Sequence, residues 1–227
     1  VSCDITEPEE DVAVPVLVVI NLETMEKKQY SGTSLNTRIS SASFINNDTL
    51  LVSRSCDRGA GSSGTVDCYS LYGINVVTGK REALIRAKQT STGQGVRYPS
   101  LFDSMPQYPN KIIITMNRMP QFPWRFRDLY WLDLDTKQTT KIAEVPDIKN
   151  EWHQQWLIDH DGNARGFITN HDDRKDREPN GARDGLYTYV YLMDPKTKKY
   201  SRMASCKHQE ACFMPLTFDA FFVSKIS

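Results

Sequence analysis

Serine, glycine and histidine are the residue types from which a hydrolytic or metal-dependent site would be built, and this sequence arranges them for neither. A nucleophilic serine on a sharp strand-to-helix turn is written G-x-S-x-G, and no such pentapeptide occurs. The glycine-rich segment Gly59–Gly64 lacks the G-K-[ST] ending of a phosphate-binding loop. We interpret it as a surface loop between Cys56 and Cys68, and we predict no catalytic residue on this chain.

The histidines do not have the spacing of a metal site either. A metal would require two or three of them with carboxylates on one scaffold, and the sequence contexts of His153, His160, His171 and His208 do not supply this. Asp159–Gly162 is similar to the start of a calcium loop but lacks the later Asx and the distal glutamate, so a hairpin turn is the prediction there. The charged segment His171–Asp184 reads as a solvated connector, with a divalent-ion site as the alternative. We predict no metal and no cofactor.

One segment combines aromatic and cationic side chains in the way that binding surfaces do. Met119–Asp128 reads MPQFPWRFRD, and aromatic residues beside arginine are enriched at binding hot spots. The alternative is that these rings pack between neighbouring sheets, which is also our expectation for Trp152 and Trp156. The candidate binding residues are Phe122, Trp124, Arg125 and Arg127.

The five cysteines include two close pairs, and neither pair has the spacing of a C-x-x-C zinc or redox motif. Two local disulfides with one odd thiol fit this pattern, and the alternative is a set of buried thiols in a reducing compartment. Disulfides would place the protein outside the cytosol. Because Cys3 lies in Val1–Asp4 (VSCD), it is a candidate for lipid modification, so we expect an exported protein, periplasmic or lipid-anchored at the cell envelope. The disulfide candidates are Cys56, Cys68, Cys206 and Cys212.

Charge and hydropathy set the class of partner. Lys plus Arg number 28 and Asp plus Glu also number 28, so no net charge attracts nucleic acid. The longest apolar run, Val14–Ile20, falls far short of the ~20 residues of a membrane-spanning helix. We therefore expect no nucleic-acid partner and no membrane span. Residues 1–13, rich in acids and poor in apolar side chains, are expected to be a disordered leader.

An internal repeat organises the rest of the sequence. Each copy is an octamer in which an apolar strand runs into a polar turn with Asn or Asp and ends in Thr, and a second strand follows. The copies recur about every 60 residues, which is the period of a repeat architecture. They are Leu17–Thr24 (LVVINLET), Leu71–Thr78 (LYGINVVT), Leu129–Thr136 (LYWLDLDT) and Val190–Thr197 (VYLMDPKT).

Between the octamers lies a second kind of hairpin, with a type I′ turn predicted at Asp161–Gly162. Four strands therefore recur per unit, and such antiparallel units bury their faces by packing on one another around an axis. We predict an all-β fold: a β-propeller with four-stranded antiparallel blades, about four of them over residues 14–227, either as a single domain or as a truncated propeller. A two-sheet sandwich is the structural alternative. The second hairpins are Ser41–Ser53, Tyr98–Asn117, Gln155–Thr169 and Met214–Ser224.

The hairpin motifs also resemble those of a known family. Leu71–Lys80 (LYGINVVTGK) and Trp156–Arg165 (WLIDHDGNAR) are similar to blade hairpins in the amino-terminal β-propeller of bacterial prolyl oligopeptidase family serine peptidases, and TolB-like exported propellers use similar ones. In the peptidases a seven- or eight-bladed propeller restricts access to an α/β-hydrolase domain that holds the catalytic triad. The resemblance implies that this chain is a fragment of the access domain, lacking the hydrolase domain, and it transfers no catalytic residue to any position here.

Three functions follow as hypotheses. The first is a non-catalytic domain that gates access of peptides to a hydrolase domain of the same polypeptide. The second is a free-standing TolB-like propeller that binds a protein partner in the cell envelope. The third is an enzymatic propeller, a lyase or glycosidase, which would require carboxylates or histidines clustered at the channel.

Overall fold

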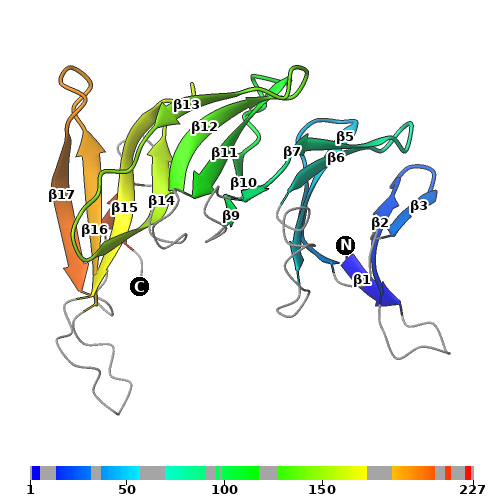
Figure 1. The fold of residues 1–227 in the computed structure, drawn as a ribbon, viewed down its shortest axis with the longest axis horizontal. Helices are drawn as coiled ribbons and strands as arrows, with labels where there is room; N and C mark the ends of the chain where they lie inside the picture. Colours follow the sequence, from blue (N-terminus) through cyan, green and yellow to red (C-terminus); the bar gives the residue numbers. More distant parts are fainter. Residues whose placement is uncertain are drawn as a thin grey trace, which may run out of the picture. The chain divides into compact units, whose positions relative to one another are not determined.

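The computed structural model describes ten stretches of the chain, and in these stretches every regular element is a β-strand (Figure 1). No helix in this part is long and apolar enough to cross a membrane. The chain divides into two compact units, the first made of Val1–Ile114 and Leu132–Gln138, the second of Thr115–Trp131 and Thr139–Ser227. The residues described are 2–5, 14–31, 37–56, 70–89, 96–97, 99–117, 127–172, 186–207, 213–215 and 223–225.

The first sheet has three strands, in the order β1 (Ser2–Ile5), β2 (Val14–Ile20), β3 (Lys27–Ser31). Both pairs are antiparallel. The sequence predicts a leader over residues 1–13, whereas residues 2–5 pair with Val14–Leu17. The physical reason is that this pairing gives the edge of β2 a ladder partner for its N–H and C=O groups. Residues 6–13 lie outside the described residues.

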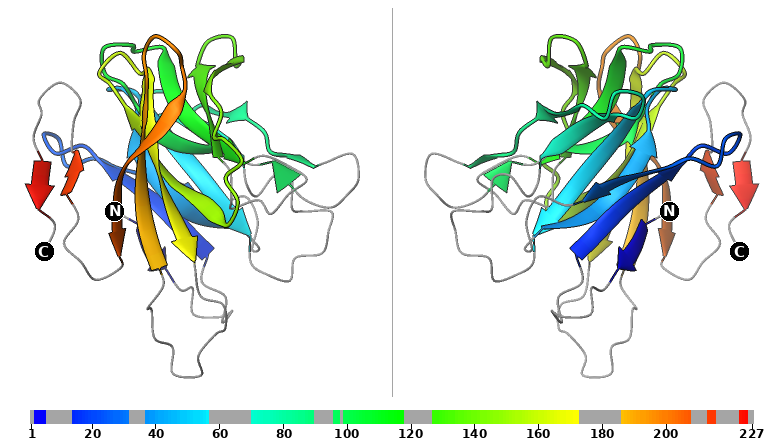
Figure 2. Two further views of the ribbon diagram at one scale, coloured as in Figure 1. Left: turned by 90° about the vertical axis from the view of Figure 1, so that its left-hand side faces the viewer. Right: turned by 90° about the vertical axis from the view of Figure 1, so that its right-hand side faces the viewer.

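Three sheets have four strands each, and in each sheet the strands follow one another in chain order (Figures 1 and 2). The first four-stranded sheet contains β4 (Thr37–Phe44), β5 (Thr49–Cys56), β6 (Leu71–Asn75) and β7 (Arg81–Ile85). The second contains β10 (Pro99–Asp103), β11 (Lys111–Asn117), β12 (Arg127–Asp133) and β13 (Thr139–Ala143). The third contains β14 (Glu151–Ile158), β15 (Ala164–Asp172), β16 (Leu186–Met193) and β17 (Tyr200–Lys207). The predicted four-stranded antiparallel unit is confirmed.

Two short hairpins complete the described strands. β8 (Lys88–Gln89) pairs with β9 (Val96–Arg97), and β18 (Phe213–Pro215) pairs with β19 (Val223–Lys225). The second of these hairpins lies where the sequence predicted one.

All four octamers build the same turn. In each, one oxygen of the Asn or Asp side chain accepts hydrogen bonds from the backbone N–H groups two and three residues later, at 2.7 to 3.2 Å. The octamer's final Thr hydroxyl then accepts from the N–H two residues further on. An Asx side chain that replaces a backbone acceptor in this way fixes the turn locally. The four Asx residues are Asn21, Asn75, Asp133 and Asp194.

The residue after the octamer's Thr has a positive φ in every copy, and only one copy has glycine there. The φ values are 59° at Met25, 74° at Gly79, 61° at Lys137 and 58° at Lys198. A side chain in this left-handed region costs on the order of 1–2 kcal/mol, a cost that glycine escapes. Three of the four turns therefore carry backbone strain.

Relief of this strain should be measurable at Lys198, whose side chain is exposed. We expect Lys198→Gly to raise the free energy of unfolding by about 0.5–1 kcal/mol in urea titrations, because glycine adopts positive φ freely. The matched control is Gly79→Ala, where a Cβ meets nothing within 4 Å and only the φ matters. It should lower stability by about 1 kcal/mol. Shifts of the same sign in both variants would contradict the explanation.

The predicted type I′ turn at Asp161–Gly162 is wrong in detail. Of these two residues only Gly162 has a positive φ, 79°, whereas type I′ requires both. The Gly162 N–H donates to the Asp159 carbonyl, and the Asp159 N–H donates to the Asn163 carbonyl. The reason is the Asp159 carboxylate, which accepts from the N–H groups of Asp161 and Asn163 and so holds the loop in a different turn.

The core of the first unit lies between the three-stranded sheet and the sheet β4–β7. One cluster joins residues of both sheets, and Lys28 of β3 donates through Nζ to the carbonyls of Val76 and Val77 beyond β6. The two sheets of the first unit thus pack face to face, as the repeat predicts. The buried members of the cluster are Leu17, Tyr30, Leu50, Val52 and Ile74.

In the second unit, the sheet β14–β17 has an apolar side chain layer on each face. One face carries the cluster of Leu157, Ile168 and Val190, with Leu192 and Ala204 against it. The other face is aromatic: the Phe167 ring stacks on Tyr191 at 4.9 Å and meets Tyr200 and Trp156 edge-on. Apolar side chains on both faces are what a propeller blade requires, because it packs against a neighbouring blade on each side.

Candidate functional site

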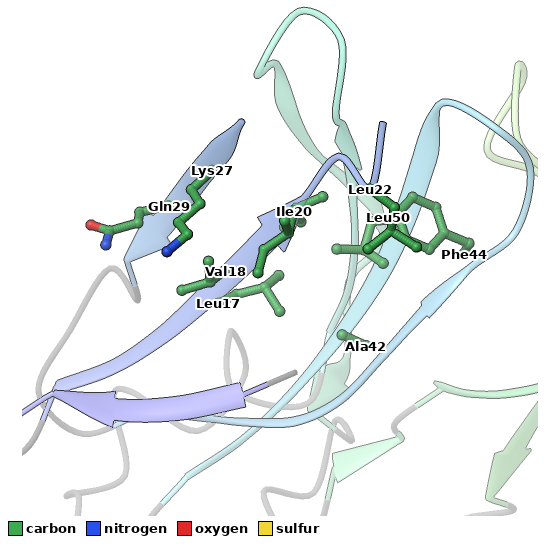
Figure 3. A pocket seen from close by; sticks show the side chains of 10 residues that line it. Leu17, Val18, Ile20, Leu22, Lys27, Gln29, Ala42, Phe44 and Leu50 are labelled. Carbon is green, nitrogen blue, oxygen red and sulfur yellow. The ribbon is translucent and has the colours of Figure 1, made fainter. Parts of the chain in front are cut away.

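The first unit contains an apolar groove of about 670 Å³ between β2, β3 and the hairpin β4–β5 (Figure 3). This volume is within the 300–1,000 Å³ typical of ligand sites. Most of its lining is aliphatic or aromatic, and its charged residue is Lys27. The lining residues are Leu17, Val18, Val19, Ile20, Leu22, Lys27, Gln29, Ala42, Phe44 and Leu50.

Strand register explains how these side chains come together. In the β4–β5 ladder Phe44 is opposite Leu50 and Ala42 is opposite Val52, and opposite residues share one face of a sheet. Leu50 and Val52 belong to the core cluster that also contains Leu17, so this face is directed at β2. The groove is therefore the continuation of the core of the first unit.

Several large apolar side chains at the groove are exposed to solvent. The exposed fractions are 85% for Leu22, 52% for Phe44 and 40% for Ile20. Scattered exposed hydrophobic residues require no explanation, but contiguous ones that line a groove mark interaction sites. Figure 3 shows Leu22, Leu50 and Phe44 gathered at one end of the groove.

The groove adjoins an incompletely paired strand. The β1–β2 ladder runs from Ile5 opposite Val14 to Ser2 opposite Leu17, whereas the β2–β3 ladder continues to Ile20 opposite Lys27. Within the described residues, Val18–Ile20 of β2 therefore have a neighbouring strand on one side only.

Besides the apolar groove, the described residues form a polar cluster on the aromatic face of the sheet β14–β17. The Glu151 carboxylate is 5% exposed and accepts hydrogen bonds from Thr169 Oγ1 at 2.5 Å and Tyr191 Oη at 2.8 Å. Burial raises the pKa of Tyr191, and its hydrogen bond to Glu151 raises it further. Thr169 lies on β15, next to the strand of Glu151, and Tyr191 lies on β16, one strand further, so the carboxylate is held by the sheet itself.

His153 lies beside this cluster and is also 5% exposed. Its ring is 5.2 Å from the Trp156 ring and 6.3 Å from Phe167, and neither of its nitrogens has a hydrogen-bond partner among the described residues. Burial lowers the pKa of His153 to about 3, and the Arg127 charge contributes. A neutral, enclosed imidazole against two aromatic rings suits packing, so we interpret this cluster as structural.

The predicted binding loop is only partly visible. Phe122, Trp124 and Arg125 lie outside the described residues, whereas Arg127 begins β12. The Arg127 carbonyl accepts a hydrogen bond of 2.7 Å from Trp156 Nε1. The buried Trp156 indole of β14 is thus hydrogen-bonded to β12 of the neighbouring sheet, and its ring lies against His153 and Phe167 of its own sheet.

Three further predictions concern the Asp159 turn, a metal site and the cysteines. Asp159 lies in a hairpin turn, as predicted. Burial by itself would raise the pKa of Asp159. Hydrogen bonds from Asn163 and Arg165, together with the Arg165 charge, outweigh burial and lower that pKa.

In the described stretches no three His, Cys, Asp or Glu side chains group as metal ligands would. Cys206 of β17 is disulfide-bonded. The predicted pairings stay predictions, because Cys68 and Cys212 lie outside the described residues.

The sequence reasoning missed the groove. A signal was present in the apolar run Val14–Ile20, whose last four residues line the groove. It also missed Glu151, for which a single sequence offers no signal.

Comparisons with known proteins gave likenesses in structure alone: no family model matches the chain, and no curated protein matches it. An oligogalacturonate lyase in complex with manganese matches with a TM-score of 0.50 and 12% identity, over 88% of this chain and 44% of that one. TolB from Acinetobacter baumannii gives 0.41 and 16%, over 84% and 37%. An acylaminoacyl peptidase from Pyrococcus horikoshii gives 0.42 and 13%, over 76% and 26%.

The fold class follows from the four-stranded sheets and the likeness to the lyase. The protein has an all-β propeller fold with four-stranded antiparallel blades. The chain spans less than half the length of each of these three structures. Identities this low show the fold and carry no activity to this chain.

Proposed function

We propose that this chain is a non-catalytic propeller domain that binds extended peptide segments and gates their access to a hydrolase domain absent from this chain. The apolar groove carries the proposal, because it offers exposed side chains such as Phe44 and Leu22 to a polypeptide. The resemblance of the blade hairpins to prolyl oligopeptidase family propellers supports the same role. Such a domain acts by steric selection and by holding the chain, without making or breaking a bond.

The groove suits an unfolded segment better than a folded protein. A folded protein of ordinary composition buries most of its large apolar side chains, whereas an unfolded segment offers them to the groove. Burial of apolar area contributes roughly 25 cal/mol per Å², so a few such side chains supply useful affinity. An access domain is required to bind unfolded segments and to exclude folded proteins.

The same groove also favours a second candidate, a free-standing propeller that binds a protein partner in the cell envelope. In that case the occupant would be a segment of one particular protein. For either function we propose an exported location, periplasmic or lipid-anchored. The disulfide at Cys206 supports this location because disulfides persist in oxidising compartments.

The test compares one protein in two states. A small protein is used in its native form and after reduction and alkylation, which keeps it unfolded, and binding to the 227-residue chain is followed by fluorescence anisotropy. We expect binding of the unfolded form alone, and Phe44→Asp should weaken it at least tenfold because it places a charge in an apolar groove. A fluorogenic proline-containing peptide should not be hydrolysed.

The matched control is Val77→Asp, which adds the same charge at a residue that is 64% exposed and outside the groove. Its binding should equal that of the wild type. Equal binding of native and unfolded forms would refute the gating function and leave the partner-binding one. Absence of binding to both forms would refute the groove as a site for unfolded segments.

A further inference from the structure

We infer that the turn between β16 and β17 docks on the anionic headgroups of a lipid bilayer. This turn has the same hydrogen bonds and the same positive φ as the other three octamer turns, but it differs from them in charge. The inference goes beyond the proposed function and does not depend on the apolar groove. The docking residues are Lys196, Lys198 and Lys199.

The first step is the difference in charge among four copies of one turn. Counted from the Asx residue, the six residues of the first turn include two glutamates, those of the second one lysine, and those of the third two aspartates and one lysine. The fourth turn has three lysines and one aspartate, and so a net positive charge. Because the other copies fold into the same turn without it, this charge is not needed for folding. The turns are Asn21–Glu26, Asn75–Lys80, Asp133–Gln138 and Asp194–Lys199.

The second step concerns the counter-charges of these lysines. In the third turn, the Lys137 ammonium group is 2.8 Å from the carboxylate of Glu82 on β7. Lys198 has the place of Lys137 in the fourth turn, but the residue of the sheet β10–β13 equivalent to Glu82 is Thr140, which has no charge. Within the described part of the chain, no carboxylate forms an ion pair with a lysine of the fourth turn. Their charges can therefore act on a partner outside the chain.

The third step is the way in which the fourth turn presents its lysines. In the sheet β4–β7 the Val76 N–H donates to the Asp48 carbonyl of the neighbouring turn at 2.8 Å. In the sheet β10–β13 the Leu134 N–H donates to the Asn110 carbonyl in the same way, at 2.9 Å. The fourth turn has Pro195 at this place, which has no N–H to donate. It therefore lacks this tie to the β14–β15 turn, and it lies at the end of its sheet with its lysines exposed (Figure 1).

The fourth step is the kind of partner. Protein interfaces are enriched in aromatic residues and arginine and depleted in lysine, whereas residues 194–199 contain three lysines and neither of the former. An anionic bilayer attracts lysine clusters by long-range electrostatics and requires no shape complementarity. Each lysine near such a surface raises the partition coefficient roughly fivefold, so three lysines together supply roughly 100-fold.

The test uses the 227-residue chain and vesicles of equal parts of phosphatidylglycerol and phosphatidylcholine, with vesicles of phosphatidylcholine alone as the neutral reference. Co-sedimentation at low salt gives the partition coefficient. We expect binding to the anionic vesicles only. Sodium chloride at about 0.5 M should abolish this binding, because it shortens the Debye length to a few ångströms.

The decisive variant replaces the three lysines of the turn by glutamine, which keeps most of the side-chain length and leaves the backbone hydrogen bonds of the turn in place. Its urea unfolding should equal that of the wild type, and it should bind anionic vesicles at least twentyfold more weakly. The matched control replaces three exposed lysines that lie apart in the sequence, and so removes the same net charge; it should bind within about threefold of the wild type. The control substitutions are Lys80→Gln, Lys111→Gln and Lys149→Gln.

Each other result overturns the inference. Equal losses in the two triple variants would show that net charge, and not this turn, causes binding. Equal binding to neutral vesicles would show that apolar insertion causes it. If polyglutamate binds the chain at low salt and anionic vesicles do not, the turn serves an acidic segment of a protein. Phe44→Asp should leave vesicle binding unchanged, so this inference and the proposed function can fail independently.

Discussion

Gly166→Ala is expected to lower the free energy of unfolding by about 3 kcal/mol or more, the largest single-residue effect that we predict. A Cβ at this position would lie 2.1 Å from the carbonyl oxygen of Tyr191, which is a backbone atom and cannot rotate away. Gly166 is opposite Leu192 in the ladder between the two central strands of the sheet β14–β17. Relief of the clash would therefore separate β15 from β16. Urea unfolding followed by tryptophan fluorescence measures the change.

A second glycine on a β-strand provides the control. The three heavy atoms nearest to a Cβ at Gly73 of β6 would all belong to the Leu84 side chain, at 3.3 to 3.4 Å. Because that side chain can shift by a few tenths of an ångström, Gly73→Ala should cost less than about 1 kcal/mol. Equal losses in the two variants would show that glycine itself, and not the approach of Tyr191, decides the effect.

Acid should destabilise the protein through His153. The folded-state pKa of His153 is about 3, below its ordinary value of 6.5, because burial disfavours the charged ring. Above pH 6.5 the residue is neutral in both states. Between pH 6.5 and pH 3 the unfolded state binds the proton and the folded state does not, so stability falls by about 1.4 kcal/mol per pH unit from this residue.

The measurement is the pH dependence of unfolding in His153→Phe, which keeps a ring against Trp156 and removes the titrating group. The wild type should lose stability between pH 6 and pH 5 by about 1 kcal/mol more than the variant. His160→Gln is the control, because His160 is 67% exposed and its replacement should leave the slope unchanged. Parallel slopes in the wild type and His153→Phe would show that His153 is protonated in the folded protein.

The repeat could be predicted from the sequence because its turn is local. The Asn or Asp of each octamer, its Thr and the left-handed residue lie within five residues of one another, so the letters alone indicate the turn. The strands on either side follow from apolar, β-branched runs such as Leu17–Ile20. Fold class and blade order therefore follow from short-range chemistry repeated at a fixed period.

The faces of the strands could not be predicted in the same way. A register shift between His153 and Gln155 in β14 places His153 and Trp156, three residues apart, on one face of the sheet. Simple alternation would have put them on opposite faces. The partners of Glu151 are 18 and 40 residues away in the sequence. The groove likewise depends on side chains of β2, β3 and the hairpin β4–β5 coming together, which is a matter of long-range packing.

The octamer turn has a consequence for how the chain acquires its structure. The backbone hydrogen bonds that close the turn on itself join residues at most five apart, as from the Asn21 N–H to the Glu26 carbonyl. Loops of this length close in well under a microsecond, and hairpins form in roughly 1–10 μs. Four ribbons can thus begin to form independently along the chain. The slow steps are those that join one ribbon to the next, and substitutions there should change the rate of folding more than substitutions in the turns.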